Sequence, residues 1–73
     1  MPKSIYSKDY RNVIERLKKA RFEANLYQED VASKLKKPQS YISKIERGER
    51  RIDVAELKEL SKIYKKDIGY FLK

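Results

Sequence analysis

Apolar residues recur at helical spacing along nearly the whole chain, and this periodicity restricts the fold more than any other feature. The clearest case is residues 9–23, where four apolar residues follow the i, i+3, i+4, i+7 pattern of one helix face: Tyr10, Val13, Ile14 and Leu17. No segment shows the alternating pattern of a half-buried strand. We therefore expect an all-α fold, with five helices around one core.

A break that contains Pro38 separates two short helical patterns, residues 28–35 and residues 39–47. Proline cannot continue a helix from behind, but it fits near the start of a new one. Gly48 stands just past the second pattern, where a left-handed C-terminal residue is favoured. Two short helices with such a break have the lengths and order of a helix-turn-helix, and equally those of an ordinary helical hairpin.

The C-terminal part of the chain predicts two further helices. Asp53 and Glu56 form a capping-box pattern, and we expect Val54 to begin the inward stripe of the helix that follows. Asp67 is placed to cap a last short helix, which carries the apolar residues Ile68, Phe71 and Leu72.

The length of 73 residues allows one domain with a modest core. We expect residues 1–8 to form a loosely held arm and residues 9–73 to form the domain. Because so small a core supplies little net stability, self-association is the expected way to add buried surface. No stretch is apolar enough to span a bilayer, and no signal peptide is visible, so we expect a cytoplasmic protein without a membrane partner.

The chain contains no cysteine and no histidine, which removes disulfides, thiolate metal sites and the commonest general base. It also contains only two glycines, too few for a glycine-rich phosphate loop. We therefore expect no enzymatic activity, no metal, no cofactor and no small-molecule ligand.

Positive charge is concentrated around the second of the two short helices. The formal net charge is +8, and residues 34–51 contain seven basic and two acidic residues. Such an excess indicates a polyanionic partner, although a solvated surface has the same composition. Cations neutralise phosphates, while the amide of Gln39 and the hydroxyl of Ser40 are suited to base edges. The pattern predicts double-stranded DNA as the partner.

Two stretches, residues 26–32 (LYQEDVA) and residues 39–48 (QSYISKIERG), resemble the phage repressor and Cro family of helix-turn-helix regulators. The likeness extends from about residue 13 to residue 72. It implies a five-helix domain that binds operator DNA as a homodimer, with residues 39–47 as the recognition helix. The family usually has glycine at the position of Lys36 and Ser or Thr at that of Pro38. We therefore expect either a left-handed Lys36 or a reshaped turn.

The resemblance also implies roles for individual side chains. Gln28 contacts a phosphate and braces Gln39, which begins the recognition helix and reads bases. Arg21 and Glu46 form an internal ion pair that can leave an arginine edge free for a phosphate. Further residues expected to read bases are Ser40, Lys44 and Tyr41, and further residues expected at phosphates are Ser43, Arg47, Arg50 and Arg51. Tyr41 has packing at the edge of the domain as an equal alternative.

A protein-interaction module, such as an antitoxin or anti-repressor subunit, is the main alternative function. Apolar residues outside the inward stripes, Ile63 and Tyr70, would supply its surface, together with Ile5 and Tyr6 of the arm. A homodimer contact explains the same residues more simply, and we expect it at Ile63, Tyr70 and Phe71. The dimer is expected to regulate transcription, as a repressor or autoregulator, from a palindromic operator.

Overall fold

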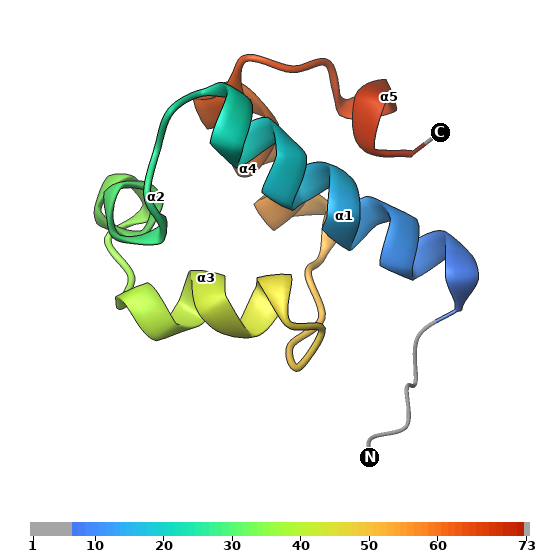
Figure 1. Cartoon of the computed structure of the whole chain (residues 1–73), viewed down its shortest axis with the longest axis horizontal. Coiled ribbons are helices and arrows are strands. Elements are labelled where there is room, and N and C mark those ends of the chain that lie inside the picture. The colour runs from blue at the N-terminus through green and yellow to red at the C-terminus, as the bar shows by residue number, and fades with distance from the viewer. Residues whose placement is uncertain (1–6, 73) are drawn as a thin grey trace.

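The computed structural model describes residues 7–72, which fold into α-helices without a strand (Figure 1). The five helices of this part of the chain are α1 (Lys8–Glu23), α2 (Gln28–Leu35), α3 (Gln39–Glu46), α4 (Val54–Tyr64) and α5 (Ile68–Phe71). The predicted all-α fold is confirmed, and the predicted helix bounds hold to within one residue. Residues 1–6, most of the predicted arm, lie outside the described residues.

The core draws on every helix. Its largest fully buried side chains are Leu17, Val31, Ile42, Ile45, Leu60 and Phe71. In Figure 1, α1 crosses the middle of the molecule, and α3 lies along one edge, on the opposite side of α1 from α5. Since only one face of α3 packs on α1 and α2, its other face is left at the surface.

Polar residues fix the helix starts. The predicted capping box forms at α4, because Asp53 Oδ1 accepts the Glu56 N–H at 2.8 Å and Glu56 Oε1 accepts the Asp53 N–H at 3.0 Å. Asp67 caps α5 as expected. At α2, where Tyr27 offers no good cap, the Asp30 carboxylate accepts the Tyr27 N–H at 2.8 Å from inside the helix. The start of α2 therefore has a side-chain cap that the sequence did not predict.

The turn between α2 and α3 keeps its shape without the glycine that is usual there. Lys36 adopts the left-handed conformation, with φ 58° and ψ 44°, and the Lys37 N–H donates to the Ala32 carbonyl at 2.9 Å. Gly48 has φ 77° just past α3. A left-handed backbone at a residue with a Cβ costs about 1–2 kcal/mol, so the turn stores strain at Lys36 that Gly48 avoids.

Two predictions about burial are wrong. Val54 is 71% exposed, because it is the first residue of α4 and that helix reaches the core only at Leu57. Phe71 is fully buried in the core of the single chain, so it has no side-chain surface for a second subunit. Within residues 7–72, no helix is both long and apolar enough to cross a membrane.

Candidate nucleic-acid interface

The two faces of α3 differ sharply in exposure. Ile42 and Ile45 are buried against the core, whereas Gln39, Ser40 and Lys44 are exposed. Ile42 and Ile45, three residues apart, share the inner face, and Ser40 and Lys44, four residues apart, share the outer face, because both spacings place side chains on one side of a helix. The start and the outer face of α3 are therefore accessible to a ligand.

A buried ion pair joins α1 to the end of α3. Arg21 Nε donates to Glu46 Oε2 at 2.8 Å and Arg21 Nη2 donates to Oε1 at 3.0 Å, with side chains 9% and 4% exposed. Arg21 Nη1 donates to the Leu26 carbonyl at 3.0 Å. The hydrogen bond to Glu46 raises the pKa of Arg21. Three of the five guanidinium N–H groups of Arg21 thus donate inside the protein, and its contact with a phosphate stays a prediction.

The same carboxylate continues into a chain of amides that reaches the start of α3. Gln28 Nε2 donates to Glu46 Oε1 at 2.9 Å, and Gln39 Nε2 donates to Gln28 Oε1. Gln39 keeps its amide oxygen and one N–H, which are the acceptor and donor that adenine needs. We call Arg21, Gln28, Gln39 and Glu46 the inner cluster.

A second cluster joins α3 to the start of α4. Tyr41 Oη donates to Glu56 Oε2 at 2.7 Å, and the two terminal nitrogens of Arg50 each lie 3.2 Å from an oxygen of the same carboxylate. The Arg50 guanidinium also lies over the Tyr41 ring, 4.6 Å from its centroid. We call Tyr41, Arg50 and Glu56 the outer cluster.

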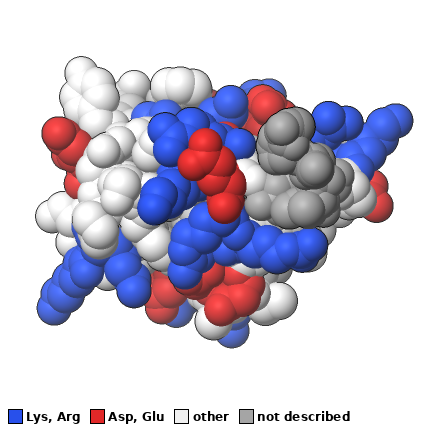
Figure 2. Space-filling view, turned by 90° about the horizontal axis from the view of Figure 1, so that it is seen from below, with Lys and Arg blue, Asp and Glu red and all other residues white. Residues whose placement is uncertain are grey.

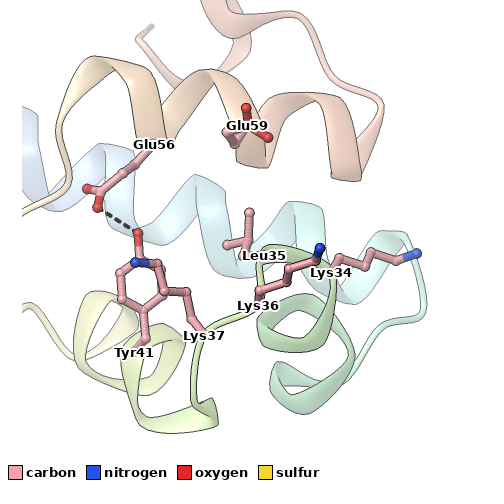
Figure 3. Close-up of a pocket in the computed structure, with 7 residues that line it drawn as sticks. All are labelled: Lys34, Leu35, Lys36, Lys37, Tyr41, Glu56 and Glu59. Carbon is pink, nitrogen blue, oxygen red and sulfur yellow. Dashed lines mark hydrogen bonds between the residues drawn. The ribbon is translucent and has the colours of Figure 1, made fainter.

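Figure 3 shows the Tyr41 hydroxyl directed at Glu56, at one end of a hollow of about 300 Å³ that Lys37 and Glu59 also line. Burial and the hydrogen bond to Glu56 raise the pKa of Tyr41 to about 12. Its hydroxyl is thus protonated and already bonded at neutral pH. The contact of Tyr41 with a sugar or a thymine methyl stays a prediction, and it would have to use the ring.

A second hollow, of about 530 Å³, opens on the outer face of α3, and we call it the α3 hollow. Its lining brings residues expected at bases together with residues expected at phosphates: Lys37, Pro38, Ser40, Tyr41, Lys44, Glu49 and Arg50. In Figure 2, which views the molecule from the side of α3, Lys and Arg side chains spread across the middle with acidic side chains between them.

The predicted phosphate residues differ in what they already contact. Arg47 Nη2 lies 3.0 Å from Glu49 Oε1, with both side chains more than half exposed, and Arg51 lies over the Tyr10 ring at 5.7 Å. Ser43 is half-buried on α3. The side chain of Lys44 makes no hydrogen bond or ion pair with another residue of the described part of the chain. Their contacts with phosphate stay predictions.

A sequence model of the helix-turn-helix family matches residues 17–71, most of the chain. The chain belongs to this Cro/C1-type helix-turn-helix family. The matched residues include α2, α3 and both members of the buried Arg21–Glu46 pair. This helix-turn-helix protein is therefore a DNA-binding transcriptional regulator. No curated protein matches the chain.

Two residues at the α3 hollow of this helix-turn-helix protein are not predicted from its sequence: Lys37, which lines the hollow, and Glu56, which contacts the lining residues Tyr41 and Arg50. The sequence indicates a role for Glu56 only in the α4 capping box, and its spacing of fifteen residues from Tyr41 gives no local signal. The predicted dimer residues are also more engaged than expected: Ile63 packs partly buried against the core, and the half-buried Tyr70 ring has Lys66 at 4.7 Å. Within residues 7–72, no group of acidic side chains could hold a metal ion.

Proposed function

We propose that two copies of the protein bind a roughly palindromic operator, with one α3 helix in the major groove of each half-site. The observation that carries this proposal is the Gln39 amide, which stands exposed at the start of α3 and is oriented by the inner cluster. In this arrangement the half-site centres lie about 34 Å apart, one turn of DNA.

Base contacts in the proposal come from three exposed residues of α3. The free edge of the Gln39 amide pairs with adenine N6 and N7, and the Lys44 ammonium reaches guanine O6 and N7 or a phosphate. Ser40 lies one turn before Lys44 on the same face and donates or accepts. The cooperation of these three residues would give each subunit a preference over about four base pairs.

Phosphate contacts in the proposal supply affinity without sequence preference. They come from Gln28 at the start of α2, from Ser43, and from the three arginines that follow α3, which are Arg47, Arg50 and Arg51. Occupancy of a promoter by the dimer would then repress transcription or control the protein's own gene. With no ligand in the proposal, the concentration of the protein in the cytoplasm sets the response.

Selection from a random duplex library tests this proposal. We expect one enriched sequence with two-fold symmetry, and sedimentation of the complex as two chains per duplex. Enrichment without symmetry would contradict the dimer, and equal retention of all sequences would contradict base readout by α3.

A protein-interaction module is the second candidate, and one observation favours it. Phe22 and Tyr27 are both largely exposed and line the same hollow of about 280 Å³. Exposed aromatic side chains in one place are typical of protein contacts. Gel filtration separates the candidates, since a stable dimer supports self-association and a lone monomer supports a foreign partner.

A further inference from the structure

Glu56 accepts hydrogen bonds from three residues that precede it in the chain. Its carboxylate accepts the Tyr41 hydroxyl of α3 at 2.7 Å, the N–H of the α4 N-cap Asp53 at 3.0 Å, and the Arg50 guanidinium of the loop between α3 and α4 at 3.2 Å. Burial raises the pKa of Glu56, but these hydrogen bonds outweigh it, and the pKa lies below its ordinary value. The carboxylate is therefore ionised and fixed in place at neutral pH.

The Arg50 guanidinium contacts three groups at once. Both terminal nitrogens contact the Glu56 carboxylate, Nη1 donates to the Arg51 carbonyl at 2.9 Å, and the guanidinium plane lies over the Tyr41 ring. A guanidinium has five N–H donors, of which these contacts use three. The side chain is 40% exposed and lines the α3 hollow beside Ser40 and Lys44.

From this geometry we infer that Glu56 is a positioning residue for DNA binding. Its carboxylate and the Tyr41 ring hold Arg50 at the wall of the α3 hollow, where the two remaining N–H groups meet a backbone phosphate. Glu56 itself touches no DNA. The DNA step of the inference rests on the proposed function, whereas the holding of Arg50 is a property of the free protein.

The physical advantage lies in the entropy of the arginine. A free arginine side chain loses rotamer freedom when it binds a phosphate, and one that is already held loses less. Electrostatics alone predicts the opposite effect of Glu56, because an acidic group beside DNA repels phosphate. The sign of the effect of removing the charge of Glu56 therefore separates the two accounts.

The experiment compares Glu56→Gln with a matched control, Glu59→Gln. Both remove one negative charge from α4, and Glu59 is exposed and makes no ion pair with another described residue. Glutamine keeps the capping-box contact at the start of a helix, so the fold should persist, and a thermal melt checks this. Kd is measured on the selected duplex over a series of salt concentrations.

We expect E59Q to bind as tightly as the wild type or more tightly, and E56Q to bind about 3- to 10-fold more weakly, the size of one hydrogen bond. R50A should lose a similar factor on every sequence and lower the salt slope by about one. The double variant R50A/E56Q should be no weaker than R50A. Tighter binding by E56Q, or losses that multiply in the double variant, would overturn the inference.

A second measurement keeps the inference distinct from the proposed function. In the NMR spectrum of the free protein, we expect separate, slowly averaging Arg50 guanidinium signals that collapse in E56Q and persist in E59Q. If the wild type shows averaged signals, Glu56 does not hold Arg50, whatever the protein binds. If these signals behave as expected but no duplex is preferred, the proposed function fails and the DNA step fails with it.

Discussion

The inner and outer clusters both join an arginine to a glutamate beside α3, and they differ chiefly in burial. The side chains of Arg21 and Glu46 are 9% and 4% exposed, whereas those of Arg50 and Glu56 are 40% and 24% exposed. Removing one partner of a buried pair leaves an uncompensated charge, while exposed pairs contribute little to stability. From this comparison we infer that the inner cluster holds α3 in place, whereas the outer cluster positions Arg50 for its ligand.

Glu46→Ala tests the structural half of this comparison and should have the largest effect. We expect the free energy of unfolding to fall by about 3–5 kcal/mol, because the buried Arg21 guanidinium is left without its anion. Urea denaturation measures it. The control is Arg21→Met with Glu46→Met, which removes both charges and should recover much of the loss. A loss below about 1 kcal/mol for E46A would place the inner cluster in the same class as an exposed pair.

Gln39→Ala tests the exposed end of the inner cluster. We expect binding to the selected duplex to weaken by roughly 1–3 kcal/mol and binding to random duplex to change little, because a base contact is lost and no phosphate contact is. A fluorescence titration on both duplexes measures this. The control is Ser43→Ala, on the half-buried side of α3, whose proposed phosphate contact should weaken binding to both duplexes alike. An equal loss on the two duplexes would remove Gln39 from base readout.

Alkaline pH should weaken the outer cluster before the inner one. The pKa of Tyr41 is raised to about 12 in the folded chain from an ordinary value of 10. The folded state therefore holds this proton more tightly, and the stability it contributes is complete below pH 10 and is lost between pH 10 and pH 12. We expect roughly 1–2 kcal/mol of the free energy of unfolding to disappear over this range.

Tyr41→Phe is the control for this pH dependence. The difference in unfolding free energy between the wild type and Y41F should shrink across pH 10–12, which subtracts other titrating groups. Tyr64 is one of these, since burial raises its pKa as well. A difference that stays constant would show that the Tyr41 hydroxyl contributes nothing through Glu56.

Glu49→Gln should have the smallest effect on stability. The Arg47–Glu49 pair is more than half exposed on both sides, so we expect a change of about 0–1 kcal/mol in the free energy of unfolding. Binding to every duplex should tighten slightly, because Arg47 loses a competing anion. Weaker binding would mean that Glu49 positions Arg47 as Glu56 is inferred to position Arg50.

Local patterns predicted the helices, since caps and the 3.6-residue period act within a few residues, as at Asp53 and Gly48. The predicted inward position of Val54 and the predicted dimer contact of Phe71 were wrong, because burial depends on which helices pack together and periodicity does not give this. Residue spacing could not pair Tyr41 with Glu56, which are fifteen residues apart and meet only in the folded chain. The contacts of Gln28 with Gln39 and of Arg21 with Glu46 came from the family resemblance.

The hydrogen bond from Gln39 to Gln28 has a consequence for how such a regulator acquires a new target. The residue at position 39 has to fit both the proposed base contact and the hydrogen bond to Gln28. Most substitutions there should therefore disturb the anchoring of α3 as well as its base preference. Ser40 and Lys44 make no such bond with other residues in the range 7–72. Divergence among descendants, or deliberate retargeting in the laboratory, should therefore proceed through positions 40 and 44 while the glutamine is retained.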